Sequence, residues 1–308
     1  MIHGYRGRFA PTPSGPLHFG SMIAAIASFC DARSNDGNWY VRIDDIDAPR
    51  AVAGVADDIL HTLDAFALHW DGRPLCQSTN KDAYHRALHL LRSNGRVFYC
   101  ACSRKDVSET GIPGPQGPVY AGTCRNGLAS GRLARSLRLR VDNHTVSGFT
   151  DGLQGEVRQD LATEVGDFVV YRSGGMFSYH LACVVDDALL GITDIVRGAD
   201  LIDCTLRQIF LQRLLGVPTP RYLHLPVATH PDGAKLSKQT HAAPVDPAQA
   251  SPTIYQALRF LGQQPPTELA LWPPQTALEW AVKSWRRKRL PAVCAIESPP
   301  VSTLPVIN

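Results

Sequence analysis

Two short polar segments, far apart along the chain, constrain this sequence more than any other feature. The first, His18-Phe-Gly-Ser21, ends a turn rich in proline and glycine. The second, Lys235-Leu-Ser-Lys238, lies far downstream in a stretch that also contains glycine. Each segment alone is typical of an ordinary surface loop, but the two in this order predict one shared site for an anion. The chain must therefore adopt a fold that brings them together.

The residues around the first segment predict a strand, a turn and a helix. Residues 5–11 favour a short strand, and residues 21–33 favour a helix because apolar residues recur at helical spacing. The start of a helix offers free backbone N–H groups to an anion. Gly20 allows close approach to a nucleotide, and His18 and Ser21 can add side-chain donors. We therefore predict that this turn binds the phosphates of ATP.

The second segment brings positive charge to the same site. Residues 231–239 predict a mobile loop whose lysines can neutralise charge as pyrophosphate leaves. We expect ATP to enter as its Mg²⁺ complex. The four predicted catalytic side chains are His18, Ser21, Lys235 and Lys238. The predicted ATP-binding residues are His18, Gly20, Ser21, Lys235, Leu236, Ser237 and Lys238.

Five motifs in this order resemble one family. Residues 8–21 are similar to the "HIGH" region of the glutamyl-type class I aminoacyl-tRNA synthetases, and residues 235–239 to their "KMSKS" loop. Residues 41–50, 184–187 and 195–200 match internal motifs of the same family. The resemblance covers about residues 5–240. It implies an α/β fold, in which a Rossmann-type class I catalytic domain carries an inserted zinc-bearing subdomain and a short helical C-terminal region.

The resemblance also implies how the chain is divided. We expect the two halves of the catalytic domain to form a parallel sheet, with ATP at the carboxyl ends of its strands. In the C-terminal region we expect one helix with Ser251 as N-cap, ending at Gly262, and a second over residues 276–289, with residues 297–308 loosely held. The expected parts are residues 1–98 and 176–240 for the two halves of the catalytic domain, 99–175 for the inserted subdomain, and 241–308 for a C-terminal region without an anticodon-binding domain.

Cysteines in the expected insert suggest a metal site. The chain has eight cysteines and no apolar stretch typical of a secretory signal, so thiol chemistry other than disulfides is expected. Cys100 and Cys102 point the same way in an extended stretch, and Cys124 follows across a loop rich in glycine and proline. Three thiolates suit one structural zinc ion, which normally takes four ligands. The resemblance supplies Tyr120 as the fourth; His144 or water are the other candidates, and three free thiols are the alternative.

The resemblance further implies a pocket for glutamate. Such a pocket needs guanidinium donors for the carboxylates and an anionic partner for the ammonium group. The resemblance assigns Arg8 and Arg197 to the first task and Asp44 to the second. The family carries glutamate where this chain has Asp44, one methylene shorter, so aspartate stays open as a substrate. The other pocket residues that it implies are Phe9, Ala10, Pro11, Thr12 and Tyr179.

Within the family, the sequence is most similar to a short branch that attaches glutamate to queuosine in the anticodon loop of tRNA(Asp). Ser21 and Gln239 carry that likeness, and too few residues follow Gln239 for a large anticodon-binding region. The implied partners are glutamate and tRNA(Asp) carrying queuosine, and we expect a cytoplasmic monomer that does not contact a membrane. Two alternatives are a conventional glutamate-tRNA ligase that charges a 3′ end and a non-catalytic tRNA-binding paralogue.

A basic cluster near the C-terminus allows two interpretations. It surrounds Trp285 and contains Lys283, Arg286, Arg287, Lys288 and Arg289. The cluster fits a solvated helix end, where cations complement the helix dipole. It fits equally a patch that contacts tRNA phosphates, which would make binding depend on salt.

Overall fold

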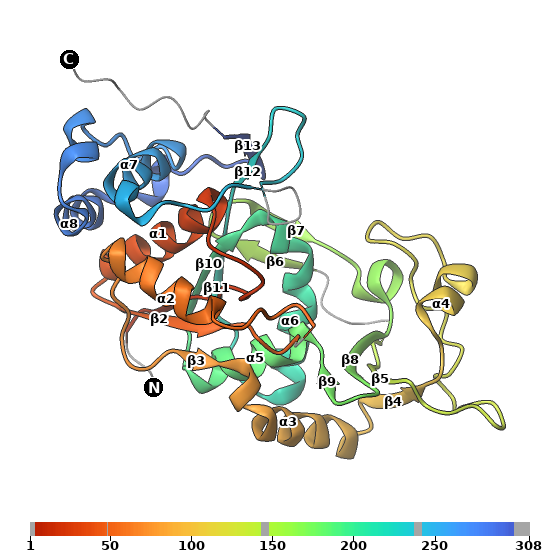
Figure 1. Cartoon of the computed structure of the whole chain (residues 1–308). Coiled ribbons are helices and arrows are strands. Elements are labelled where there is room, and N and C mark those ends of the chain that lie inside the picture. The colour runs from red at the N-terminus through yellow and green to blue at the C-terminus, as the bar shows by residue number, and fades with distance from the viewer. Residues whose placement is uncertain (1–3, 48, 143–147, 237–241, 299–308) are drawn as a thin grey trace.

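The computed structural model describes residues 4–47, 49–142, 148–236 and 242–298, and Figure 1 shows how they are arranged. Two parallel ladders of strands lie at the centre. They meet where the backbone N–H of Thr193 donates to the carbonyl of Arg6 at 3.0 Å. The parallel sheet predicted from residues 1–98 and 176–240 is confirmed. Its strands are β1 (Arg6–Phe9), β2 (Asn38–Ile43) and β3 (Leu75–Cys76) in one ladder and β10 (Asp194–Gly198) and β11 (Arg221–Leu225) in the other.

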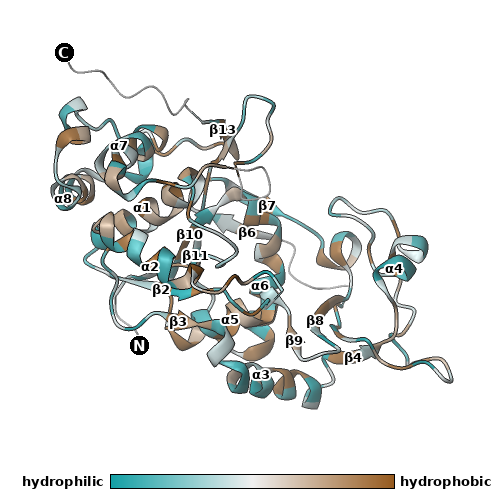
Figure 2. Cartoon of the chain, viewed as in Figure 1, coloured by the Kyte–Doolittle hydropathy of each residue, from teal (hydrophilic) through white to brown (hydrophobic). Residues whose placement is uncertain are grey.

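Helix α1 (Phe19–Arg33) follows β1 and lies between the sheet and the C-terminal helices. Met22 and Ile26 are completely buried, and the apolar character of the helix is visible in Figure 2. A helix that is apolar on most sides is suited to burial on two sides. It begins two residues before the predicted start at Ser21. The other helical elements of the catalytic part are α2 (Val55–Ala65), η1 (Gln77–Thr79), α3 (Lys81–Ser93), α5 (Tyr179–Leu189), η3 (Ala199–Leu201) and α6 (Ile202–Leu215).

The inserted segment forms a four-stranded antiparallel sheet and a separate hairpin. Two of its strands, β5 and β8, pair antiparallel with each other. The hairpin packs on the catalytic sheet, since the backbone N–H of Gly152 donates to Tyr222 O on β11 at 2.8 Å. The insert therefore contacts the catalytic part directly. Its elements are β4 (Val97–Cys100), α4 (Arg104–Thr110), β5 (Ser136–Leu139), β6 (Gly148–Asp151), β7 (Gly155–Arg158), the π-helical turn η2 (Leu161–Val165), β8 (Phe168–Arg172) and β9 (Met176–Phe177).

The C-terminal region is helical, as predicted, but its boundaries differ. Ser251 is not the N-cap of the first helix: it lies inside α7, and its hydroxyl donates to Trp272 O at 2.5 Å. The second helix spans Pro274–Ser284 rather than 276–289, because Trp285 leaves the helical backbone conformation. Glu297 was expected to be loosely held, yet it pairs with Thr229 in a parallel ladder; residues 299–308 lie outside the described residues. The elements are β12 (Val227–Thr229), η5 (Pro247–Gln249), α7 (Ala250–Phe260), η6 (Thr267–Leu271), α8 (Pro274–Ser284), η7 (Arg287–Arg289) and β13 (Ala295–Glu297).

A buried carboxylate on α1 fixes the C-terminal region to the catalytic part. Asp31 is 1% exposed and accepts hydrogen bonds from Tyr5 Oη at 2.5 Å and Trp285 Nε1 at 3.0 Å. Arg287 adds a bidentate ion pair, with both distances at 2.7 Å. A buried charge is tolerated when it is paired and hydrogen-bonded in this way. Arg287 is therefore a docking residue, whereas its basic neighbours Arg286 and Lys288 remain exposed.

Among the described residues, no helix has both the length and the apolar character needed to cross a bilayer.

Candidate active site

A cavity of about 190 Å³ lies where three strands of the central sheet end. β1 ends at Phe9, β10 at Gly198 and β11 at Leu225, and all three residues line the cavity. In open parallel sheets, ligands bind at the carboxyl ends of the strands because the following loops converge there. The position of the cavity thus matches the position predicted for ATP.

Both polar segments reach this cavity. His18, Gly20 and Ser21 line it from the start of α1, and Lys235 and Leu236 line it from the chain after β12. A methyl group on Gly20 would lie 3.1 Å from His18 Cε1 and 3.5 Å from Leu236 O, so a side chain here would crowd the His18 ring. Ser237 and Lys238 lie outside the described residues. The structure brings together the described members of the two segments, although they are distant in sequence.

The start of α1 is built to face an anion. The carbonyl of His18 accepts hydrogen bonds from the N–H groups of Ser21 and Met22, which closes the first turn. The first turn contains no acidic side chain, so the positive end of the helix dipole is not neutralised there. The backbone N–H groups at this end, together with His18, form an environment that suits phosphate oxygens.

Lys235 is held at the opposite wall by a carboxylate. Its Nζ donates to Asp200 Oδ2 at 2.5 Å, and Asp200 lies in η3 just after β10. The backbone of the segment is tied to β12, since Leu236 N–H donates to Ala228 O at 2.8 Å. The lysine charge therefore lies at the cavity. Sequence reasoning did not single out Asp200, although it lies within the matched motif at 195–200.

A buried network of charges supports Arg8. Arg8 Nε donates to Asp187 Oδ1 at 3.1 Å, and Arg42 Nη1 donates to the same oxygen at 2.7 Å. Burial would raise the pKa of the Asp187 carboxyl, but the two arginines outweigh it and hold that pKa below its usual range. Asp187 therefore stays ionised and orients Arg8, whose two Nη groups have no protein acceptor among the residues that the structure describes. Sequence reasoning did not assign Arg42 and Asp187 a role, although both lie in matched motifs.

Asp44 forms a buried ion pair with Arg42. Its carboxylate receives hydrogen bonds from Arg42 Nε at 2.6 Å and Nη2 at 3.2 Å. It does not line the cavity, and neither do Pro11 and Thr12, although Arg8, Phe9, Ala10, Tyr179 and Arg197 do. The contact between Asp44 and an ammonium group therefore stays a prediction. In this structure Asp44 contributes to the network that orients Arg8.

Arg197 faces the cavity from β10 and is 5% exposed. Its partners are not carboxylates: Nε donates to His224 Nε2 at 3.0 Å, and Nη1 donates to Gln208 Oε1 at 2.9 Å. Behind the ring, His224 Nδ1 lies 2.6 Å from Asp151 Oδ2. Sequence reasoning missed Asp151, His224 and Gln208. In the sequence, the one feature that could have indicated them is that they are polar residues within largely apolar segments.

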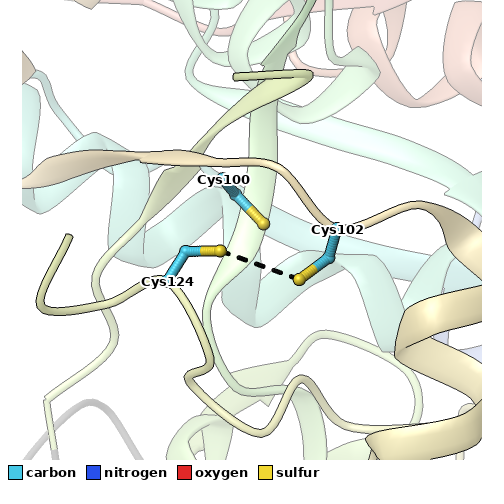
Figure 3. Close-up of side chains that lie close together, drawn as sticks. All are labelled: Cys100, Cys102 and Cys124. Carbon is cyan, nitrogen blue, oxygen red and sulfur yellow. Dashed lines mark hydrogen bonds between the residues drawn. The ribbon is translucent and has the colours of Figure 1, made fainter. Parts of the chain in front are cut away.

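The three predicted cysteines lie together in the insert. The sulfur atoms of Cys100, Cys102 and Cys124 lie within 4.8 Å of one another, and those of Cys102 and Cys124 are 3.7 Å apart (Figure 3). Ligands at about 2.3 Å from a tetrahedral zinc ion would lie roughly 3.8 Å apart. Tyr120 Oη is 3.6 Å from Cys100 Sγ, and Arg138 Nε donates to that sulfur at 3.3 Å. The three sulfur atoms lie close enough together to hold one metal ion.

The environment of Cys100 favours its thiolate. Burial raises the pKa of this thiol, but hydrogen bonds from Tyr120 and Arg138 outweigh burial and lower the pKa to about 7. The thiolate is the form that binds a metal. All eight cysteines are free in this structure. His144, the other candidate ligand, lies outside the described residues.

The fold and the cavity are those of a class I aminoacyl-tRNA synthetase catalytic domain. The family model "tRNA synthetases class I (E and Q), catalytic domain", which covers the glutamate and glutamine enzymes, matches residues 5–256, and the chain belongs to this family. It is 51% identical to the Glutamyl-Q tRNA(Asp) synthetase of Aromatoleum aromaticum, over 96% of this chain and 93% of that protein. It is also 51% identical to the protein of the same name from Dechloromonas aromatica, over 94% and 97%. The resemblance seen in the sequence is confirmed.

Solved structures support the same fold. A glutamate tRNA ligase from Elizabethkingia meningosepticum, crystallised with its amino acid, superimposes with a TM-score of 0.79 at 20% identity, covering 96% of this chain and 67% of that one. The methionyl-tRNA synthetase of Mycobacterium tuberculosis superimposes with a TM-score of 0.57 at 12% identity, covering 83% and 64%. At these identities the likeness shows the fold alone.

Proposed function

We propose that this chain activates glutamate with ATP and transfers the glutamyl group to queuosine in the anticodon loop of tRNA(Asp). The observation that carries this proposal is the single cavity lined by both polar segments and by Arg8 and Arg197. Relatives that are about half identical over nearly the whole chain bear the name Glutamyl-Q tRNA(Asp) synthetase. We place the enzyme in the cytoplasm, where its RNA substrate is made, and keep the prediction of a monomer.

In the first step, the α-carboxylate of glutamate attacks the α-phosphorus of ATP. A bond forms between a carboxylate oxygen and phosphorus, and the bond to the bridging oxygen of pyrophosphate breaks. His18, the start of α1 and Lys235 stabilise the charge that develops on the phosphoryl oxygens, and we assign Lys238 and Ser21 to the same task. Mg²⁺ bound to ATP supplies further positive charge to the departing pyrophosphate. None of these residues forms a covalent bond with the substrate.

Glutamate is held by the two arginines. Arg8 uses Nε for Asp187 and keeps both Nη groups for a carboxylate, which can accept two parallel hydrogen bonds. Tyr179, half-buried at the cavity wall, adds a neutral donor because burial raises the pKa of its phenol well above the usual value. Asp44 is the proposed partner of the ammonium group, reached through a shift or a bridging water.

In the second step, a hydroxyl of the queuosine cyclopentenediol attacks the mixed anhydride. The ester bond to the RNA base forms as AMP leaves and the hydroxyl proton passes to solvent. A conventional ligase would instead use the ribose at the 3′ end of tRNA. The name that the relatives bear supports queuosine, rather than the 3′ ribose, as the acceptor.

The domain assignment and the zinc site belong to the same proposal. We assign residues 1–98 and 176–240 to the catalytic domain, 99–175 to the insert, and 241–308 to a C-terminal region. We propose that Cys100, Cys102, Tyr120 and Cys124 bind one structural zinc ion. The distances between their side chains and the low pKa of the Cys100 thiol support this assignment.

Two measurements test the function. Exchange of labelled pyrophosphate into ATP should require glutamate, and should be much weaker with glutamine or aspartate; no exchange would make the chain a non-catalytic binder. Native tRNA(Asp) carrying queuosine should accept labelled glutamate, while an unmodified transcript of the same tRNA should not. Equal labelling of both RNAs would instead identify a conventional ligase.

A further inference from the structure

The side chains behind Arg197 form a chain of buried hydrogen bonds. Arg197 Nε donates to His224 Nε2 at 3.0 Å, and His224 Nδ1 lies 2.6 Å from Asp151 Oδ2. The side chains of His224 and Asp151 are both completely inaccessible to solvent. Asp151 ends β6 in the inserted segment, His224 lies on β11, and Arg197 lies on β10. Three separate parts of the chain therefore meet at one guanidinium group.

The contacts determine which nitrogen of His224 carries the proton. A guanidinium group can only donate, so His224 Nε2 must accept from Arg197 and cannot carry hydrogen. The proton is then on Nδ1, where it is donated to the Asp151 carboxylate. Burial and the nearby Arg197 keep the pKa of His224 below its usual value despite Asp151, so the ring stays neutral. The other tautomer would place two donors face to face at Arg197 Nε and two acceptors face to face at Asp151 Oδ2.

Asp151 is itself held in one orientation. Its Oδ1 accepts from the backbone N–H groups of Leu153 and Gln154, both at 2.9 Å, and from that of His224 at 3.1 Å. Because Oδ1 is occupied by three donors, Oδ2 is the oxygen that faces the His224 ring. The turn between β6 and β7 thus fixes the carboxylate, and the carboxylate fixes the ring.

The remaining N–H groups of Arg197 are almost all used. Nη2 donates to Thr205 Oγ1 at 2.8 Å and to Leu201 O at 3.3 Å, and Nη1 donates to Gln208 Oε1 at 2.9 Å. Among the described residues, four of its five N–H groups therefore have protein acceptors, and one on Nη1 is left for a ligand. A guanidinium group held this way presents one donor in one direction, which suits the reading of a single carboxylate oxygen.

We propose that Asp151 and His224 are positioning residues that aim Arg197 at a carboxylate of glutamate. Through them the β6–β7 hairpin of the insert sets the affinity for the amino acid. This inference rests on the proposed function, because it takes Arg197 as a glutamate-binding residue. It adds that amino-acid recognition depends on a hairpin outside the two polar segments.

Asp151→Asn tests the inference with little change in shape. The three backbone donors need an acceptor, so the amide oxygen takes the place of Oδ1 and the amide NH₂ faces His224 Nδ1. The ring must then carry its proton on Nε2, directly against Arg197 Nε. We expect the KM for glutamate in pyrophosphate exchange to rise roughly ten- to a hundredfold, while the KM for ATP changes less than twofold. Gln154→Ala is the matched control, because Gln154 Nε2 ties the hairpin to His224 O without touching the ring; its KM for glutamate should stay within about twofold of wild type.

A second pair of variants separates positioning from packing. In His224→Gln, the amide oxygen can reach the place of Nε2 and accept from Arg197; in His224→Asn, the shorter side chain can reach Asp151 only. Glutamate binding should be retained better in His224→Gln, although both variants remove the ring. If Asp151→Asn does not fold, this pair decides. Equal glutamate KM values in the pair, or an ATP KM that rises in parallel, would overturn the inference. Loss of glutamate-dependent exchange in the wild type would instead contradict the proposed function.

Discussion

The catalytic cavity and the cysteine cluster (Cys100, Cys102, Cys124 and Tyr120) are stabilised in different ways. In the cavity, Arg8 is held by Asp187 and Arg197 by His224, partners that come from distant parts of the chain. In the cysteine cluster, the thiols lie beside one another and beside Tyr120, all from one stretch of the chain, and Arg138 on β5 also donates to Cys100 Sγ. Thiolates placed together repel unless a cation balances them. The fold alone positions the side chains of the cavity, whereas a bound ion should position those of the cluster. Catalytic activity and metal binding should therefore respond to different substitutions.

The largest effect is expected from Lys238→Ala. We assign this lysine to the catalytic cavity, where it should stabilise negative charge on the phosphoryl group. Its loss should slow glutamate-dependent pyrophosphate exchange by about 10²–10³-fold, the effect of removing one transition-state donor, without shifting the midpoint of thermal unfolding. Lys105→Ala, an exposed lysine in the insert, is the matched control. Near-normal exchange by Lys238→Ala would remove this residue from the mechanism.

The next largest effects are expected from substitutions of two buried arginines, Arg8 and Arg42. They distinguish binding of glutamate from stabilisation of the fold. Arg8→Gln should raise the KM for glutamate about a hundredfold with a modest loss of stability, because Arg42 still pairs with Asp187. Arg42→Gln should instead destabilise the fold by about 3–5 kcal/mol, because it leaves Asp44 buried without its ion-pair partner and Asp187 paired with Arg8 alone. Chemical unfolding and exchange kinetics on both variants check this. An unstable Arg8→Gln or a stable Arg42→Gln would show that the two roles are assigned wrongly.

A smaller effect is expected from breaking the cysteine cluster. Cys102→Ser should release zinc, measurable by metal analysis, and lower stability by on the order of 2 kcal/mol. Pyrophosphate exchange should stay within about twofold of wild type, because the cluster contributes no residue to the cavity. Cys294→Ser, at an exposed cysteine, is the control. A large loss of exchange in Cys102→Ser would mean that the cluster and the cavity are coupled, and the comparison above would fail.

Local sequence patterns predicted much of the fold and the lining of the cavity. His18, Gly20 and Lys235 were found because phosphate binding uses a few residue types at fixed places around a strand-turn-helix unit. Asp151 and His224 were missed because their role exists only after distant strands meet. Nothing near either residue in the sequence reveals that His224 contacts Arg197 or that Asp151 contacts His224. The sequence pattern also placed the end of the second C-terminal helix too far along the chain. The hydrogen bond from Trp285 to Asp31 overrides helical propensity there.

Asp44 also shows that a sequence motif does not determine which charged side chains pair. The resemblance placed this residue by its position in a matched motif, next to a strand end. In the structure, its carboxylate accepts a hydrogen bond from Arg42, which lies two positions earlier in the sequence. Sequence identifies which charged residues gather near a site, but the pairing among them depends on side-chain geometry that a motif does not contain.

The smallest expected effect concerns the basic cluster around Trp285, where the structure separates docking from RNA contact. Arg287→Gln should lower the free energy of unfolding by about 1 kcal/mol, because the ion pair with Asp31 is half-exposed and partly screened while Tyr5 and Trp285 keep their hydrogen bonds. That loss corresponds to roughly 2–4 °C in the unfolding midpoint. Lys288→Gln, next to it and exposed, should leave the midpoint unchanged but weaken tRNA binding and reduce its dependence on salt. If Lys288→Gln changes neither property, the exposed cations do not contact RNA, and only the docking role of this cluster stands.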